Sequence, residues 1–201
     1  MKINRKFFFE YTKSYLFEGR FKQSQVDGLN LILDYWEANH VNKEDRFLAY
    51  ILGTAHHEVD KKMKPINEYG GKRYFKRLYD IEGSNPNLAR SLGNTTPGDG
   101  VKYHGRGFVQ VTGKSNYKVW NDRLSIDLIN DPDLALDTGV AVQILFGGMI
   151  DGTFTGKKLA DSFNTTTDNW RNARRTVNGL DKADNIASFA KAYYAAISYR
   201  L

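Results

Sequence analysis

The sequence predicts one mainly α-helical domain, residues 1–201, with a small lobe of loops and a β-hairpin in its middle. Its length suits a single domain that can bury a core without staples. Apolar side chains recur at helical spacing before about residue 62 and after residue 118, whereas glycines and prolines interrupt residues 64–118. So long an irregular segment in a compact domain usually carries function, so the candidate site is sought there and beside it.

The first predicted helix covers residues 24–38. Ser24 is placed to cap its N-terminus, and Asp27 follows three residues later as in a capping box. The apolar stripe behind this cap consists of Val26, Leu29, Leu33 and Trp36. These positions share one face at a period of 3.6 residues, which indicates an amphipathic helix against a core.

A second helix is predicted over residues 43–62, "KEDRFLAYILGTAHHEVDKK". Asn42 is its expected cap, and Glu44 and Asp45 place negative charge in its first turn. Pro65 marks its expected end. The apolar face is formed by Phe47, Leu48, Ile51, Leu52 and Ala55.

Residues 64–118 are predicted to be loop, with one short hairpin. Pro86, Pro97 and repeated glycines break any periodicity there. The stretch "YHGRGFVQVTG", residues 103–113, contains Phe108, Val109 and Val111, which favour strand.

Helices return after residue 118. Asp131 and Pro132 resemble a cap followed by a proline in the first turn. Residues 137–150, "DTGVAVQILFGGMI", are apolar nearly all round, which predicts a buried central helix.

Two further helices are predicted near the C-terminus. One covers residues 168–179, with Asp168 as cap and Gly179 as stop. The other covers residues 181–201, and its core face is expected to carry Ile186, Phe189, Tyr193 and Ile197.

Charge and composition narrow the class of protein. The chain contains no cysteine, which excludes disulfides, thiol nucleophiles and cysteine-based zinc sites. A net charge of +6 suits a polyanionic partner, but the basic residues are dispersed, so no nucleic acid is expected. Phe7 to Phe9 resemble a signal peptide, yet Glu10 and Lys13 interrupt the apolar run, and nowhere do 18 apolar residues follow one another. We expect synthesis in the cytoplasm, no membrane anchor and, by default, a monomer.

The stretch "AHHEVDKKMKPINEYGG", residues 55–71, holds the main catalytic candidates. His57 and Glu58 begin a zinc-protease pattern, but Lys61 occupies the second ligand position, so neither a metal nor any other cofactor is expected. Glu58 instead continues the stripe that includes Ala55. A carboxylate at the edge of an apolar face is desolvated, and desolvation favours the protonated form that a general acid needs. The alternative is an ion pair with Lys62, four residues on.

Glu68 lies past the predicted helix end and is the candidate second carboxylate. Sugar hydrolysis uses two carboxyl groups, one to protonate the leaving oxygen and one to activate water or to attack. Asp80 and Glu82 are rivals for that role. The alternative for Glu68 is a solvated side chain paired with a nearby lysine or arginine.

The stretch "VKYHGRGFVQVTGKSNY", residues 101–117, resembles a sugar-binding segment in its chemistry. Gly105 and Gly107 allow a sharp turn or the close approach of a ligand. Hydroxyl and amide groups alternate with aromatic rings there, which suits the hydroxyls and apolar faces of a sugar. These polar and aromatic candidates are Tyr103, Arg106, Gln110, Thr112, Asn116 and Tyr117. The alternative is a tight hairpin whose polar groups satisfy its own backbone; no phosphate-binding or nucleophile-elbow motif occurs.

These stretches, in this order, resemble the family 19 glycoside hydrolases, chitinases with a lysozyme-type fold. "AHHE" is similar to the family's helix-borne A-H-E, and "YHGRGFVQVTGKSNY" to its Y-x-G-R-G-x-x-Q signature. "NDPDLALD" and "RRTVNG" resemble two further family segments, while "MKPINEYGG" and "LGNTTPGDG" are similar to the phage endolysin branch. The resemblance covers roughly residues 22–195. It implies a lysozyme-like α+β fold, a helical body and a small lobe flanking a glycan cleft.

The resemblance also implies roles for single residues. Glu58 falls on the general acid, Glu68 on an acidic position of the endolysin branch, and Thr112 on the residue that helps to hold the catalytic water. Positions expected to contact sugar are His57, Tyr103, Gln110, Asn116, Tyr117 and Asn178. Gly105, Arg106 and Gly107 are expected to shape and brace the loop.

The implied function is cleavage of β-1,4 bonds in bacterial peptidoglycan by a phage or prophage endolysin without a separate wall-binding module. Such a protein accumulates in the host cytoplasm and reaches the periplasmic wall through a holin pore. The alternatives are a chitinase acting on N-acetylglucosamine polymers and a glycan-binding domain without catalysis.

Overall fold

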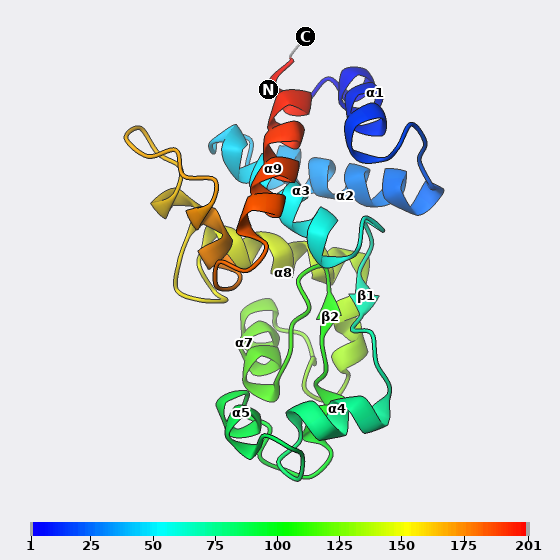
Figure 1. The fold of residues 1–201 in the computed structure, drawn as a ribbon, viewed down its shortest axis with the longest axis vertical. Coiled ribbons are helices and arrows are strands. Elements are labelled where there is room, and N and C mark those ends of the chain that lie inside the picture. The colour runs from blue at the N-terminus through cyan, green and yellow to red at the C-terminus, as the bar shows by residue number, and fades with distance from the viewer. Residues whose placement is uncertain (1, 200–201) are drawn as a thin grey trace. The chain divides into compact units, whose positions relative to one another are not determined.

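The computed structural model describes residues 2–199 and is mostly helical (Figure 1). In chain order, its helices (α, and 3-10 helices η) and strands are α1 Arg5–Leu16, α2 Gln23–Asn39, α3 Asp45–Glu58, β1 Ile66–Asn67, α4 Lys72–Tyr79, α5 Pro86–Ser91, α6 Asp99–Lys102, β2 Arg106–Gly107, α7 Lys114–Leu124, η1 Pro132–Leu136, α8 Thr138–Ile150, η2 Leu159–Asp161, η3 Asn172–Thr176 and α9 Ala183–Ser198. The chain forms two compact units. Unit 1 contains the chain up to Lys64 and from Val142 onward, and unit 2 is Pro65–Ala141.

The core of unit 1 is built around α3 and α9, which pack against each other along much of their lengths (Figure 1). Gly53 makes this close approach possible, because a Cβ atom there would lie 2.7 Å from the backbone nitrogen of Ala190. Helix α1 packs on α9 and α2 on α3. The result is that the end of α3, where Glu58 lies, is held from several sides.

Helices α8 and α9 confirm two predictions, while α1 was not predicted. The side chains of α8 are mostly buried, as expected for a helix that is apolar all round. Helix α9 places Ile186, Tyr193 and Ile197 in the core, and the predicted positions 200–201 lie outside the described residues. Helix α1 follows the cap Asn4, whose Oδ1 accepts a hydrogen bond from a backbone N–H one turn ahead at 3.1 Å.

The boundaries of α2 and α3 differ from the predicted ones. Helix α2 begins after Lys22, whose backbone N–H donates to the side chain of Gln25 at 2.7 Å, so Ser24 is not the cap. Helix α3 begins after Glu44 rather than Asn42 and ends at Glu58, four residues before the predicted end. Left-handed residues, and not Pro65, turn the chain away: φ is 49° at Asp60, 59° at Lys61 and 51° at Met63.

Unit 2 holds helices where loop was predicted. Its glycines and prolines separate short helices instead of preventing them; Pro86, for example, opens α5 after the cap Asn85. Strands β1 and β2 pair antiparallel, with Ile66 opposite Gly107. Of the predicted hairpin, the structure forms only one isolated β-bridge, between Arg106 and Val111.

The predicted helix over residues 168–179 is wrong. Only the short helix η3 forms there, because Asp168 is drawn into a β-bridge with Phe163 and an ion pair with Arg46 at 3.1 Å. Asp131 does cap the segment that Pro132 opens, although that segment is the 3-10 helix η1. Within residues 2–199, no helix is long and apolar enough to cross a membrane.

His56 is a titratable group enclosed in the core of unit 1. Its ring is 1% exposed and lies between the rings of Phe17 and Phe189. Nδ1 lies 3.0 Å from the hydroxyl of Tyr193, and Nε2 has no partner among the described residues. Burial, with a smaller contribution from the charge of nearby Lys61, lowers the pKa of His56 to about 4.

We predict that His56 makes the protein less stable in mild acid. Its pKa in the folded state lies below the 6.5 of a free side chain, so the unfolded state binds more protons and stability is lost as pH falls from about 6.5 towards about 4. The contribution between pH 7 and pH 5 is about 2 kcal/mol. Urea unfolding at both pH values should show a shallower loss for His56→Gln than for the wild type. Equal losses would contradict the assignment.

Candidate active site

Glu58 is the last residue of α3 and forms an ion pair with Arg174. Its Oε1 accepts a hydrogen bond from Nη1 of Arg174 at 2.5 Å. The Glu58 side chain is 17% exposed and that of Arg174 5%, so the pair is largely removed from water. The anticipated pair along the helix with Lys62 is replaced, because α3 ends before Lys62. Within residues 2–199, no hydrogen bond reaches Oε2 of Glu58, so only one of its two oxygens is occupied by a donor.

Arg174 is a site residue that the sequence analysis missed. It lies in η3, 116 positions from Glu58, and its Nε also donates to the carbonyl of Asp181 at 3.2 Å. The available signal was indirect: an ionised carboxylate at the edge of an apolar face is stabilised by a nearby cation, but nothing in the sequence says which one. Sequence alone offered Arg171, Arg174 and Arg175 in the same segment.

Glu68 is the carboxylate around which the candidate site in unit 2 is built. It directly follows β1, and its backbone N–H donates to the carbonyl of Gly105 at 2.8 Å. Its Oε2 accepts from the backbone N–H of Gly105 at 3.0 Å, and its Oε1 accepts from the hydroxyl of Tyr79 at 2.8 Å. Both oxygens are therefore oriented by donors from other segments of the unit. The carboxylate is half-buried, not solvated.

The hydroxyl of Tyr79 remains a hydrogen-bond donor to the carboxylate of Glu68. Burial raises the pKa of the Tyr79 hydroxyl, and the hydrogen bond to Glu68 raises it further. The hydroxyl therefore keeps its proton at neutral pH, and it fixes Oε1 of Glu68 in place.

Gly105 lets three polar side chains converge on one point. A Cβ atom there would lie 2.9 Å from Oε2 of Glu68 and 3.1 Å from both Oε1 of Gln110 and Oγ1 of Thr112. Gln110 takes a left-handed conformation, with φ of 54°, and its Nε2 donates to the carbonyl of Ile66 at 3.2 Å. Thr112 donates its hydroxyl to the carbonyl of Gln110 at 2.9 Å. The side chains of Glu68, Gln110 and Thr112 thus form a single cluster, which we call the Gly105 cluster.

The structure separates Glu68 from its two rivals. Asp80 is 0% exposed, and its carboxylate accepts backbone hydrogen bonds from Glu82, Gly98 and Gly100 at 2.8 to 3.2 Å. No substrate reaches a side chain in that position. Glu82 lies on the surface, paired with Lys76 at 2.9 Å. Neither belongs to the Gly105 cluster.

Arg106 braces the loop that carries the Gly105 cluster. The side chain is buried, and its Nε donates to Asp133 at 2.7 Å. Its Nη1 donates to the carbonyls of Lys102 and His104 and to the Tyr117 hydroxyl. Gly107, with φ of 90°, supplies the turn that follows.

Tyr103 and Tyr117 lie in the core of unit 2, although they were expected to contact sugar. They are 2% and 0% exposed, and their rings lie 5.5 Å apart. The Tyr103 hydroxyl donates to the carbonyl of Ile129 at 3.0 Å, and the Tyr117 hydroxyl donates to that of His104 at 2.9 Å. Their burial gives them a supporting role instead.

The other expected sugar contacts lie at or near the surface. Asn116 is exposed and donates to the carbonyl of Thr112 at 2.7 Å, and Asn178 is exposed near the end of the segment that holds Arg174. His57 is half-buried beside Glu58 on α3. In the part of the chain that the structure describes, no group of three or more histidine, aspartate or glutamate side chains is arranged to hold a metal ion.

Comparisons with known sequences point to one family. The sequence profile of glycoside hydrolase family 19, described as chitinase class I, matches residues 33–173. Chitinase 11 of Oryza sativa subsp. japonica is 51% identical over 39 residues, which make up 19% of this chain. The match spans only 15% of that relative's length.

Two solved structures resemble the whole chain. Chitinase C from Streptomyces griseus gives a TM-score of 0.66 at 18% identity, covering 98% of this chain and 92% of that one. A bacterial family 19 chitinase gives a TM-score of 0.53 at 21% identity, covering 95% and 94%. At such identities the likeness shows the fold alone, and it confirms the predicted lysozyme-like class.

We predict that Asp80 is a structural residue and Glu82 a dispensable one. Asp80→Asn places an amide N–H₂ or a weaker acceptor against three buried backbone donors, and should lower the free energy of unfolding by about 2 kcal/mol. Glu82→Gln, the matched control, removes one exposed ion pair and should change it by less than about 0.5 kcal/mol. Urea unfolding followed by tryptophan fluorescence measures both. Similar values for the two variants would contradict this division.

Proposed function

Because the chain belongs to the chitinase class I family, glycoside hydrolase family 19, we propose that it is a phage or prophage endolysin that hydrolyses the β-1,4 glycosidic bonds of bacterial peptidoglycan. The observation that carries the proposal is that each unit holds one oriented carboxylate. Glu58 is half-buried against Arg174, and Glu68 is held by two donors within the Gly105 cluster. Sugar hydrolysis requires two carboxyl groups in different roles.

We assign the general acid to Glu58. It delivers a proton to the glycosidic oxygen as the bond from that oxygen to the anomeric carbon breaks, so that the leaving sugar departs as an alcohol. In the assignment Oε2 carries this proton while Oε1 keeps its hydrogen bond from Nη1 of Arg174, and the ion pair is the state that Glu58 reaches once the proton has left. Arg174 is the positioning residue that fixes the rotation of the carboxyl group.

We assign the general base to Glu68 and the holding of water to Thr112. A water molecule forms its bond to the anomeric carbon while Glu68 accepts one of its protons. The Thr112 hydroxyl and the Glu68 carboxylate lie around the same point at Gly105, where a water molecule can contact both. Use of Glu68 as a direct nucleophile is the alternative, and the anomeric form of the first product distinguishes the two routes.

Amide side chains supply the proposed contacts to sugar. Gln110, Asn116 and Asn178 carry both donors and acceptors, which suit hydroxyl and N-acetyl groups. His57 is proposed as a further contact because it lies beside Glu58 and is half-buried. Tyr103 and Tyr117, which are buried in the core of unit 2, are not among the proposed contacts.

Peptidoglycan is the preferred substrate because the chain is basic and two of its loops resemble those of phage endolysins. The net charge of +6 suits an anionic wall polymer. The proposal includes a monomer, made in the host cytoplasm, that reaches the periplasmic wall through a holin pore. Chitin is the second candidate, favoured by the names of the similar proteins, and a binding domain without catalysis is the third.

The first test of this proposal removes each carboxyl group in turn. Glu58→Gln and Glu68→Gln should each lower hydrolysis of purified peptidoglycan at least about a thousandfold, because a single acid or base contributes 10²–10⁴ and the two act together. Circular dichroism should show an unchanged fold. Glu82→Gln is the control and should keep full activity. Normal lysis by Glu58→Gln would remove the acid assignment, and cleavage of chitin oligosaccharides alone would move the enzyme to the second candidate.

A second test addresses the Gly105 cluster without touching a reacting group. In Gly105→Ala the added methyl group meets Glu68, Gln110 and Thr112 at about 3 Å, so the three side chains must move apart. We expect a fall in kcat of about a hundredfold, since a misplacement of about 1 Å has that effect. Gly71→Ala, whose added methyl meets nothing within 4 Å, is the matched control. Equal kcat values for both variants and the wild type would contradict the role of the cluster.

A further inference from the structure

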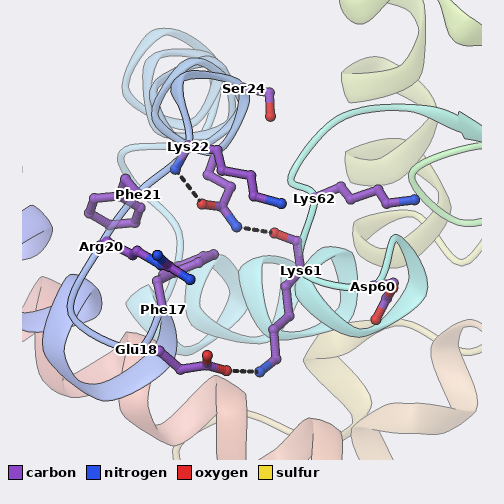
Figure 2. A pocket seen from close by; sticks show the side chains of 10 residues that line it. Phe17, Glu18, Arg20, Phe21, Lys22, Ser24, Asp60, Lys61 and Lys62 are labelled. Atoms are coloured by element: carbon purple, nitrogen blue, oxygen red, sulfur yellow. Dashed lines mark hydrogen bonds and ion pairs between the residues drawn. The ribbon is translucent and has the colours of Figure 1, made fainter.

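Unit 1 contains a pocket of about 300 Å³ that is lined in part by residues 60–62, two to four positions after Glu58 in the chain (Figure 2). Its walls come from the end of α1, the connection to α2, the first turn of α2 and the left-handed turn at residues 60–62. This pocket, which we call the turn pocket, contains none of the residues assigned above to catalysis. Lys61 follows Glu58 by three residues, so their Cα atoms lie at most about 11 Å apart.

The turn pocket is held in a fixed shape. The side chain of Gln25 bridges its two sides: Oε1 accepts from the backbone N–H of Lys22 at 2.7 Å, and Nε2 donates to the carbonyl of Lys61 at 2.9 Å (Figure 2). Gly28 allows α2 to lie on the turn, because a Cβ atom there would coincide with the carbonyl oxygen of Met63. Left-handed residues other than glycine persist only where the surroundings fix them, and they gather at functional sites.

The lining of the turn pocket combines charged side chains with aromatic rings. It contains four cations, Arg20, Lys22, Lys61 and Lys62, and two acids, Glu18 and Asp60. Glu18 pairs with Lys61 at 3.1 Å. Within residues 2–199, no ion pair joins the side chain of Arg20 or Lys22 to a carboxylate. The rings of Phe17 and Phe21, 4.8 Å apart, form the apolar wall.

We propose that the turn pocket binds a carboxylate of the wall polymer, with Arg20 and Lys22 contacting the anion and Phe17 and Phe21 contacting the small apolar group next to it. This inference rests on the proposed function and adds to it a determinant of substrate class. Peptidoglycan carries such carboxylates on its stem peptides and, where a stem peptide is absent, on its lactyl ethers, whereas chitin carries none. A strand bound at Glu58 brings its substituents within reach of the pocket, because the turn begins at the next residue but one.

Two features of the pocket favour a carboxylate attached to a short aliphatic group over a small inorganic anion. The side chains of Arg20 and Lys22, which form no ion pair within residues 2–199, can donate charge-assisted hydrogen bonds to a carboxylate. Such hydrogen bonds are stronger than those between neutral groups. Contact with the adjacent phenylalanine rings stabilises a bound methyl or methylene group beside the charge, as in lactyl and alanyl groups. A neutral sugar gains neither contribution, so the pocket should separate the two polymers by the charge on their substituents.

The experiment measures binding, not cleavage, in the full chain carrying Glu58→Gln. Three probes are titrated: a disaccharide–tetrapeptide from peptidoglycan, the peptide-free disaccharide with its lactyl carboxylate, and neutral chitobiose. Each is compared between this parent, the parent with R20Q and K22Q, and a control with K43Q and K191Q, which removes the same charge at exposed positions elsewhere in unit 1. We expect R20Q with K22Q to raise Kd about tenfold for a carboxylated probe and to leave chitobiose unchanged.

The outcomes separate the sources and the hypotheses. A rise in Kd for the peptide-free disaccharide alone assigns the lactyl carboxylate, a rise for the tetrapeptide probe alone assigns a carboxylate of the stem peptide, and a rise for both shows that either anion fits; each of these results supports the turn pocket. An unchanged Kd, an equal rise for chitobiose, or an equal rise in the charge-matched control overturns it. If the wild type fails to cleave peptidoglycan, the proposed function falls, while the binding titration still decides the pocket.

Discussion

The ion pair between Glu58 and Arg174 is the interaction on which the candidate site in unit 1 depends. Two charges removed from water are stable only when each finds its partner with good geometry, and breaking such a pair costs about 3–5 kcal/mol. Here the partners lie 116 residues apart, so the pair joins the end of α3 to η3. Helix α3 is itself fixed by α9 through the close approach at Gly53. The carboxyl group proposed as the acid is therefore held both from its backbone and from its oxygen.

Unit 2 uses a buried guanidinium for a related purpose. Arg106 does not contact Glu68; it contacts the carbonyls and the tyrosine that shape the loop after Tyr103. That loop brings Gly105 against Glu68, and the missing side chain at Gly105 leaves room for Gln110 and Thr112. In each unit an arginine thus orders the segment beside a carboxylate. In unit 1 the arginine holds the carboxylate itself, whereas in unit 2 backbone and tyrosine donors do so.

The helical spacing and density of apolar residues predicted α2, α3, α8 and α9, which are helices that bury many of those residues in the core. It missed α4, α5 and α6, which have eight, six and four residues and are too short to show a period. It also carried α3 beyond Glu58, because helical pattern does not reveal the left-handed turn that Gln25 and Gly28 fix from α2. Contacts between distant segments are the part of the structure that local pattern does not contain.

The same limit applied to the site. Glu58 was visible because it continues an apolar stripe, and Glu68 because it follows that stripe closely. The choice between Glu68, Asp80 and Glu82 needed burial and hydrogen bonds, which place Asp80 inside unit 2 and Glu82 on its surface. Arg174 was hidden because its partner lies on another element. Tyr103 and Tyr117 looked like sugar contacts because aromatic residues in a loop serve either a ligand or a core, and the sequence does not separate these uses.

The most direct measurement is digestion of purified Gram-negative peptidoglycan, followed by borohydride reduction and mass spectrometry of the fragments, for the wild type and Glu58→Gln. We expect fragments with newly reduced muramic acid ends from the wild type and none from the variant. Reduced N-acetylglucosamine ends would leave the proposed roles of the carboxylates unchanged, but would show that the enzyme cuts the other glycosidic bond of the glycan strand. Absence of any fragment from the wild type, with hydrolysis of chitin oligosaccharides, would contradict the proposed substrate, and equal fragments from both proteins would contradict the role of Glu58.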